Sequence, residues 1–374
     1  MTMTLERPAP VPVHRPALSP VPSTPAPGTD LSAERVEELG RRLDALREEV
    51  VASRGVDDAD YIHRVIRAQR MLEVAGRGLL FAGILPPAWL AGTACLSVAK
   101  ILENMELGHN ILHGQWDWMN DPEIHSSTWE WDTMSPSWAW KESHNYKHHV
   151  FTNVVGKDRD VGYGILRMSD EQPWHPYYLG NPVYNVLLSL FFEWGVALHD
   201  LEVERILARE KPMGVVWTQL KGIGRKMRRQ VTKDYLVLPA LAGPFFAPVL
   251  LGNVTANLVR NVWSHAIIFC GHFPDGAVQF QEEQLDGETR GQWYVRQMLG
   301  SANLDGGRLF HLLTGNLSFQ IEHHLFPDLP SNRYHELAPR VRALCEEFGL
   351  EYTTGPLSRQ YRQVLRRVNR LALP

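Results

Sequence analysis

Histidines gathered in three short clusters are the residues of this chain best suited to chemistry. The clusters are His109 with His113, His144 with His148 and His149, and His323 with His324. A spacing of four places two side chains on one face of a helix, and an adjacent residue is turned by roughly 100°. Neutral imidazoles bind iron, zinc, copper or nickel. One such pair is a weak signal, but three clusters together predict a metal centre.

The ligand count favours two metal ions over one. Seven imidazoles exceed the four ligands of a tetrahedral site. Cys95, Cys270 and Cys345 are far apart in the sequence and form no C-x-x-C pair, which excludes a thiolate site and fits a reducing intracellular setting. The clusters also lack the Glu-x-x-His pair of the carboxylate di-iron bundles. We therefore predict a histidine-rich centre with two iron ions.

Two more histidines follow in one apolar stretch. His272 lies in a Gly-His-Phe-Pro turn at the end of that stretch and is expected to be an eighth ligand. His265 lies seven residues earlier, which is roughly 10 Å deeper in a helix, and is expected to be buried and hydrogen-bonded. The histidines without metal spacing, expected to be structural or exposed, are His14, His63, His125, His175, His199, His311 and His335.

Polar side chains near the clusters are candidates for orienting the ligands, because a metal-bound imidazole usually donates its other N–H to an acceptor. The candidates are Glu106, Asp160, Gln320 and Glu322. Solvated charges on a helix face are an equal alternative for Glu106 and Glu322. We expect no catalytic residue beyond the metal ligands.

Six tryptophans crowd the region between the first two clusters. They are Trp116, Trp118, Trp129, Trp131, Trp138 and Trp140. They are expected either to wall an apolar substrate tunnel or to form an aromatic belt at a membrane interface.

The segments that must position these residues begin after a leader. Residues 1–30 are rich in proline and predict a disordered leader. The apolar residues between Leu31 and Val51 have helical spacing and predict an amphipathic helix, with Val36, Leu39, Leu43, Leu46 and Val50 on its buried face. One domain is expected over residues 31–360, followed by a basic tail over residues 361–374.

Two uncharged stretches, Leu79 to Ala99 and Tyr235 to Val259, predict membrane spans within longer hairpins. Met71 to Leu107, broken at Pro86-Pro87, is interpreted as one transmembrane hairpin, and Tyr235 to Phe273, with a turn near Gly252-Asn253, as another. Leu179 to His199 is expected to be interfacial or re-entrant. The basic segment Arg205 to Lys233 is expected to be cytoplasmic.

The predicted fold class is therefore all-α. It is a polytopic membrane protein with two transmembrane helical hairpins, about four spans, and a cytoplasmic helical cap that carries the histidine clusters. The expected location is the cell membrane, with the active site and both termini in the cytoplasm. A large helical protein without spans is the alternative, since the mean hydropathy is −0.24.

The three clusters, H-x-x-x-H, H-x-x-x-H-H and Q-x-x-H-H, resemble the histidine boxes of the membrane fatty acid desaturase family. GHNILHGQWDWMNDPEIHSSTWEWD and FCGHFPDG resemble segments of actinobacterial acyl-CoA desaturases of the stearoyl-CoA delta-9 type, whereas QIEHHLFP also resembles front-end desaturases. Asn110 replaces the aspartate usual in front-end enzymes, and the chain carries no H-P-G-G haem motif.

This resemblance implies an oxidoreductase that uses iron, as Fe2+ and Fe3+, and O2 to place a cis double bond in a long-chain acyl-CoA, reducing O2 to water. It implies a lipid bilayer as surroundings and a separate electron donor, a ferredoxin or a cytochrome with its reductase. A front-end or linoleoyl-CoA-type desaturase, a di-iron lipid hydroxylase, a membrane zinc hydrolase and a non-catalytic scaffold are the competing functions. A net charge of −4 gives no reason to expect nucleic acid as a partner.

Overall fold

The computed structural model describes residues 28–374, and nearly all regular structure in this range is helical. Only two strands, β1 (Asn303–Asp305) and β2 (Thr354–Pro356), occur in the described range, and they pair in parallel. Most of the predicted leader, residues 1–27, lies outside the described range.

The first helix, α1 (Ala33–Ser53), confirms the amphipathic pattern expected from the sequence. Its buried residues include all five of the apolar positions predicted to face the core. They pack with residues of α13 (Arg290–Leu299) and α16 (Tyr334–Phe348) in one cluster. The Asp44 carboxylate accepts hydrogen bonds from Arg290 and Tyr294 at the edge of this contact. The helix therefore covers the C-terminal part of the chain.

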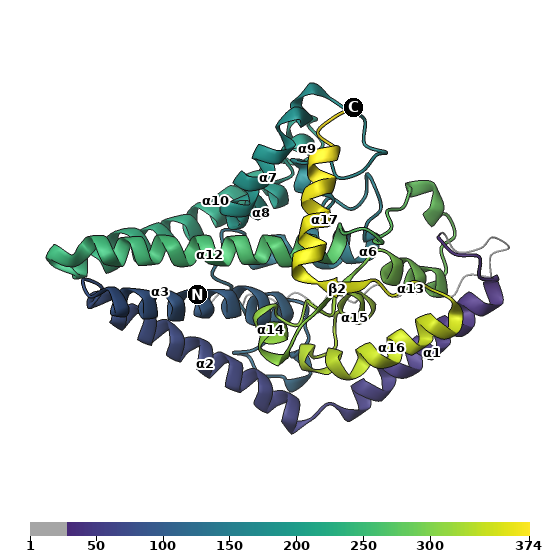
Figure 1. Ribbon diagram of the computed structural model, residues 1–374, viewed down its shortest axis with the longest axis horizontal. Coiled ribbons are helices and arrows are strands. Elements are labelled where there is room, and N and C mark those ends of the chain that lie inside the picture. Colours follow the sequence, from purple (N-terminus) through teal and green to yellow (C-terminus); the bar gives the residue numbers. More distant parts are fainter. Residues whose placement is uncertain (1–27) are drawn as a thin grey trace, which may run out of the picture.

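Three long helices run side by side in Figure 1: α2 (Val56–Phe81), α3 (Pro86–Leu102) and α12 (Phe246–His272). The break between α2 and α3 falls just before Pro86-Pro87, as expected, because proline is tolerated at the first turn of a helix but not in its interior. α2 and α3 form a helical hairpin, and α12 packs along it.

The prediction of a membrane protein is wrong for this structure. Among residues 28–374, no helix is both long enough and apolar enough to cross a lipid bilayer. α3 has 17 residues, whereas a span needs about 20, and α12 buries polar side chains such as Asn257, Arg260 and Ser264 along its length. The four predicted spans and the predicted multi-pass location in the cell membrane are therefore wrong, and the cytoplasmic cap and the cytoplasmic placement of both termini, which were derived from those spans, lose their basis.

The second hairpin was also placed wrongly. The chain turns at η7 (Gly243–Phe245), and α12 then runs without a break through the predicted turn at Gly252-Asn253. Because Gly252 has no side chain, the Leu80 side chain can pack closely against α12; a Cβ at residue 252 would clash with it. Asn253 donates a 2.7 Å hydrogen bond to the Asp234 carbonyl. Both residues therefore serve helix packing.

Shorter elements fill the remaining segments. After α3 the chain forms, in order, η1 (Glu103–His109), α4 (Asn110–Leu112), η2 (Asp117–Met119), α5 (Ser137–Trp140), η3 (Lys141–His148), α6 (His149–Phe151), η4 (Gly162–Gly164), η5 (Pro176–Gly180), α7 (Asn181–Leu190), α8 (Phe192–Leu201), α9 (Val203–Leu207) and α10 (Met213–Gln230). Leu179 to His199, predicted as one interfacial or re-entrant helix, is divided between α7 and α8.

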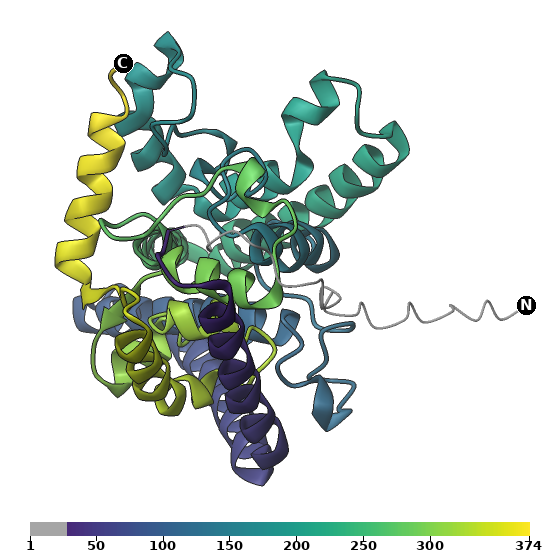
Figure 2. The same cartoon turned by 90° about the vertical axis from the view of Figure 1, so that its right-hand side faces the viewer.

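The rest of the chain, from residue 231 onward, contains α12 and a further set of mostly short elements. After η6 (Val231–Val237) and α11 (Leu238–Leu241) lead into η7 and α12, the remaining elements are η8 (Glu282–Leu285), α14 (Arg308–Leu313), α15 (Gln320–Leu325), η9 (Ser331–Arg333) and α17 (Leu357–Arg370). In Figure 2, α17 lies along one edge of the molecule. The predicted boundary between domain and basic tail, at residues 360 and 361, falls within α17, and that division stays a prediction.

Close packing between α1 and α13 provides a test of the fold. A Cβ on Gly291 would lie 2.5 Å from the Val36 carbonyl oxygen, whereas a Cβ on Gly78 of α2 would meet nothing within 4 Å. We expect Gly291→Ala to lower the free energy of unfolding by about 1–3 kcal/mol. Gly78→Ala should raise it by about 0.5–1 kcal/mol, because alanine favours helix. Chemical denaturation of both variants checks this, and equal midpoints would contradict the α1–α13 contact.

Candidate metal centre

The three histidine clusters come from elements far apart in the chain. His109 ends η1, His144 and His148 lie in η3, and His323 and His324 lie in α15. Both η1 and η3 are π-helical, and single π turns of this kind occur frequently at functional sites. The sequence predicted ordinary helices here, yet in η3 the spacing of four still stacks the two rings, with centroids 4.9 Å apart.

The clusters converge on one centre, with His272 at the end of α12 beside them. The potential ligand atoms of His109, His113, His144 and His323 lie within 4.8 Å of one another, and so do those of His148, His272 and His324. His149 lies between the two groups, with ring centroids 4.5 Å from His113 and 4.4 Å from His324. Figure 1 shows the end of α12 directed toward α6 and α15. All eight predicted ligands are thus brought together, in two adjoining groups.

Burial keeps most of these imidazoles neutral. Burial, together with the neighbouring imidazoles, holds the pKa values of six rings well below their usual range: His109, His113, His149, His272, His323 and His324. Burial also lowers the pKa of His144. The neutral ring is the form that binds a metal. At His148 burial acts in the same direction, but Asp158 and Asp160 outweigh it and raise the pKa to about 9.

The donor set fits metal ions. Within residues 28–374, six buried nitrogens of the eight converging rings have no hydrogen-bond partner: Nε2 of His113, His144 and His324, both nitrogens of His149, and Nδ1 of His272. A buried nitrogen without a partner costs about 1–3 kcal/mol. Two metal ions bound between these rings would satisfy those nitrogens. No thiolate lies among these rings, since Cys270 and Cys345 are buried elsewhere as free thiols.

Two aspartates hold the rings of the second cluster. Asp160, expected from the sequence, places Oδ2 3.3 Å from Nδ1 of His144, and its Oδ1 lies 2.9 Å from Nε2 of His199. Asp158, which we did not predict, lies 3.0 Å from Nδ1 of His148. Its place two residues before Asp160 was the available signal. No spacing pointed to His199, which is buried.

The glutamates near the clusters have a different role. Glu106 accepts hydrogen bonds from Tyr61, Asn316 and Ser331, and burial raises its pKa to about 7. In the described range its carboxylate lies against none of the histidine rings. It is fully buried, so the solvated alternative is wrong.

Glu322 is likewise fully buried and contacts none of the described histidine rings. Its carboxylate accepts hydrogen bonds of 2.8 Å from Asn303 and 2.8 Å from Tyr352. Burial raises its pKa to about 7. Both glutamates thus join segments of the fold through these hydrogen bonds, and a role in orienting the ligands stays a prediction.

Gln320 does reach a predicted ligand, since its Nε2 lies 3.0 Å from Nε2 of His272. His265 lies outside both groups of histidines and stacks on Phe269 with centroids 4.0 Å apart. Burial lowers its pKa to about 3. The hydrogen bond expected for it is absent, because neither ring nitrogen has a partner in the described residues.

Three other side chains lie against the rings of the third cluster. The Tyr334 hydroxyl is 3.3 Å from Nδ1 of His323. Thr152 Oγ1 and Gln297 Oε1 are 3.1 Å and 3.2 Å from Nδ1 of His324. Tyr334 and Gln297 come from α16 and α13, at no regular spacing from a histidine, so sequence reasoning had no signal for them.

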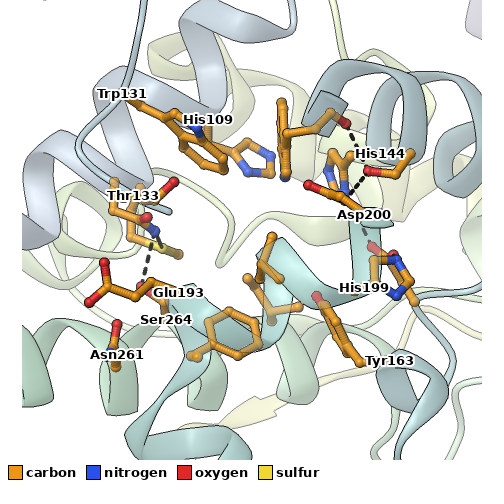
Figure 3. Close-up of a pocket in the computed structure, with 18 of the residues that line it drawn as sticks. His109, Trp131, Thr133, His144, Tyr163, Glu193, His199, Asp200, Asn261 and Ser264 are labelled. Carbon is orange, nitrogen blue, oxygen red and sulfur yellow. Dashed lines mark hydrogen bonds and ion pairs between the residues drawn. The ribbon is translucent and has the colours of Figure 1, made fainter. Parts of the chain in front are cut away.

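A cavity opens beside His109 and His144, as Figure 3 shows. Its apolar wall is formed by Met105, Trp131, Trp140, Phe192, Val196 and Ile268. Thr133, Glu193, Asn261 and Ser264 form a polar side of the cavity. Only two of the six clustered tryptophans line it. Trp116 is fully buried in the core, and Trp138 is 41% exposed.

Comparison with known proteins gives consistent matches. The family model described as fatty acid desaturase matches residues 87–356. A protein of Mycobacterium tuberculosis named NADPH-dependent stearoyl-CoA 9-desaturase is 52% identical over 343 residues, covering 91% of this chain and 80% of that protein. The sn-1 linoleoyl-lipid 6-desaturase of a Synechocystis species is 26% identical over 292 residues, covering 74% of this chain and 79% of its own length.

The positions of His272 and His265 give a direct test of the centre. We expect His272→Ala to reduce the iron content of the purified chain, because its ring lies with centroids 4.8 Å from those of His148 and His324. His265→Leu, which removes two unpartnered nitrogens, should leave the iron content unchanged. Elemental analysis measures both. Loss of iron from His265→Leu, with full iron in His272→Ala, would reverse the assignment.

Proposed function

Since the chain belongs to the fatty acid desaturase family, we propose that it is a di-iron acyl-CoA desaturase. The proposed reaction places a cis double bond between two adjacent methylenes of a long-chain acyl group. It consumes O2, two protons and two electrons from a separate donor, and it releases water. The observation that carries this proposal is the pair of adjoining histidine groups beside a cavity with an apolar wall.

Two iron positions account for the donor set. His109, His113, His144 and His323 would hold one ion, and His148, His272 and His324 the other, with His149 between them. When bound, the iron pair supplies the activation of O2 and the removal of hydrogen from the acyl chain. Asp158 and Asp160 accept hydrogen bonds from the Nδ1–H groups of His148 and His144, which leaves Nε2 of each of these two rings for a metal.

The protein must also position the acyl chain so that the reacting methylenes face the metal centre. An unactivated methylene offers no polar group for recognition, so the walls of a cavity must select the carbon that faces the metals. Trp140 packs on His144 with ring centroids 4.4 Å apart and at the same time lines the cavity. We propose that Trp131 and Trp140 hold the reacting part of the acyl chain against the centre and exclude water there.

Electrons must come from another protein. The Mycobacterium tuberculosis relative is named as NADPH-dependent, so we propose NADPH as the ultimate reductant. Dinucleotide-binding domains use a parallel sheet of several strands, whereas residues 28–374 contain one sheet of two three-residue strands. A reductase, with a ferredoxin or cytochrome, would therefore bind NADPH and deliver electrons.

The double-bond position follows the stronger similarity. Identity of 52% to a stearoyl-CoA 9-desaturase outweighs 26% to a linoleoyl-lipid 6-desaturase. We therefore propose stearoyl-CoA as substrate and the ninth carbon as the site of the new bond, in preference to front-end chemistry.

Product analysis tests the reaction. A host that lacks its own desaturase, expressing this chain with a compatible donor, should accumulate an 18-carbon acid with a double bond at carbon 9. His323→Ala should accumulate none, while its expression level matches that of the unchanged chain. A hydroxylated product would assign the chain to oxygen insertion, and unchanged lipids with a functional donor would argue for a scaffold.

Metal content tests the centre independently. We expect about two iron ions per purified chain, in line with two groups of imidazole ligands. Elemental analysis and Mössbauer spectroscopy measure the number and the coupling of the ions. One tightly bound zinc ion per chain, without iron, would contradict the di-iron assignment.

A further inference from the structure

The two histidines of the third cluster, His323 and His324, each face an acceptor supplied by a helix outside the clusters. Which ring nitrogen is free to bind a metal depends on which one carries the proton, and the partner of the other nitrogen decides this. The hydrogen bonds around Tyr334 and Gln297 are complete enough to settle the proton positions by counting donors.

Tyr334 has a single hydroxyl proton, and that proton is already used. It is donated to the Phe326 carbonyl at 3.1 Å. Gln115 donates an N–H to the same hydroxyl oxygen at 3.0 Å. The oxygen can therefore only accept from Nδ1 of His323, 3.3 Å away. His323 then carries its proton on Nδ1, and its bare Nε2 faces Nε2 of His109 at 3.2 Å.

The same reasoning applies to His324. Thr152 donates its hydroxyl proton to the His148 carbonyl at 2.9 Å. Gln297 donates its amide N–H to the His149 carbonyl at 3.3 Å, which turns Oε1 toward the His324 ring. Two acceptors thus face Nδ1 of His324, so that nitrogen carries the proton. Nε2 of His324 has no partner among the described residues.

We propose that Tyr334 and Gln297 are positioning residues, each of which prepares one of the two metal positions. Tyr334 acts through His323 on the position shared with His109, His113 and His144. Gln297 acts through His324 on the position shared with His148 and His272. This inference rests on the proposed two-iron function.

Each residue should therefore control one ion and spare the other. Losing a partner of this kind typically weakens metal binding about 10–100-fold. Tyr334→Phe removes the acceptor of His323, and Gln297→Leu removes the amide acceptor of His324. Gln297→Glu keeps an acceptor oxygen and should preserve the affinity. Tyr294→Phe is a matched control, because it removes a buried tyrosine hydroxyl that contacts Asp44, on α1 and away from the histidines.

The experiment is an anaerobic titration of the full-length, metal-depleted chain with Fe2+ alone, with a competing chelator and thermal unfolding measured in parallel. The unchanged chain, Tyr294→Phe and Gln297→Glu should bind two ions tightly. Tyr334→Phe and Gln297→Leu should each bind one ion tightly and one about 10–100-fold more weakly. Tyr334→Phe combined with His272→Ala should weaken both positions, whereas Tyr334→Phe combined with His109→Ala should still hold one ion.

Several results would overturn the inference. Unchanged affinity for both ions in Tyr334→Phe and Gln297→Leu would show that the rings need no such partner. Simultaneous loss of both ions, with a lowered unfolding temperature, would show a structural role only. An unchanged chain that binds fewer than two ions would instead overturn the proposed function, and the inference with it.

Discussion

Crowding of neutral imidazoles in a dry interior is the constraint on which the structure depends. Eight rings meet within contact distance, and six of their nitrogens have no partner in the described range. At about 1–3 kcal/mol for each such nitrogen, the total is comparable to the net stability of a whole domain. The rest of the chain must therefore hold the rings against this cost until metal ions offset it. Folding and metal binding are coupled in such an arrangement.

The fold meets this constraint with polar residues that link distant segments. Glu106, three residues before His109, joins α2 through Tyr61 to the segments on either side of α15 through Asn316 and Ser331. Asp58 of α2 accepts hydrogen bonds of 2.6 and 2.8 Å from Arg333, the last residue of η9. These contacts fix the first cluster relative to the third without contributing a ligand. The carboxylates of Glu106 and Glu322 are engaged in buried hydrogen bonds between segments, and they contact none of the described histidine rings.

Sequence reasoning succeeded where a pattern is local. The stripe on α1 follows from helical periodicity, and the histidine clusters follow from spacing within a few residues. It failed where the contact is tertiary. Tyr334 and Gln297 reach the rings only because α13 and α16 pack against α15. The spacing of residues in the sequence does not indicate this packing.

The hydropathy argument failed for a related reason. A hydropathy argument treats the few polar side chains of a mostly apolar stretch as tolerable within a membrane span. In this structure, those side chains form contacts between helices. Arg260, in the middle of α12, forms a 2.6 Å ion pair with Glu193 of α8. The Gly-Asn pair interpreted as a turn is instead a place where Leu80 approaches α12 closely. A pattern of residue types cannot distinguish a turn from such an approach.

The π-helical form of η1 and η3 has a consequence for how the chain can vary in length. A π turn contains one residue more than the α-helical hydrogen-bonding pattern requires. Deleting one residue from η1 would restore that pattern and leave His109 and His113 together on nearly the same face, because the π turn already absorbs the extra residue. A deletion between His109 and His113, outside η1, would instead turn His113 by about 100° relative to His109. Relatives that keep this centre should therefore keep the length of the segment between these two histidines unchanged, and they should accommodate insertions in the loop between η2 and α5 instead.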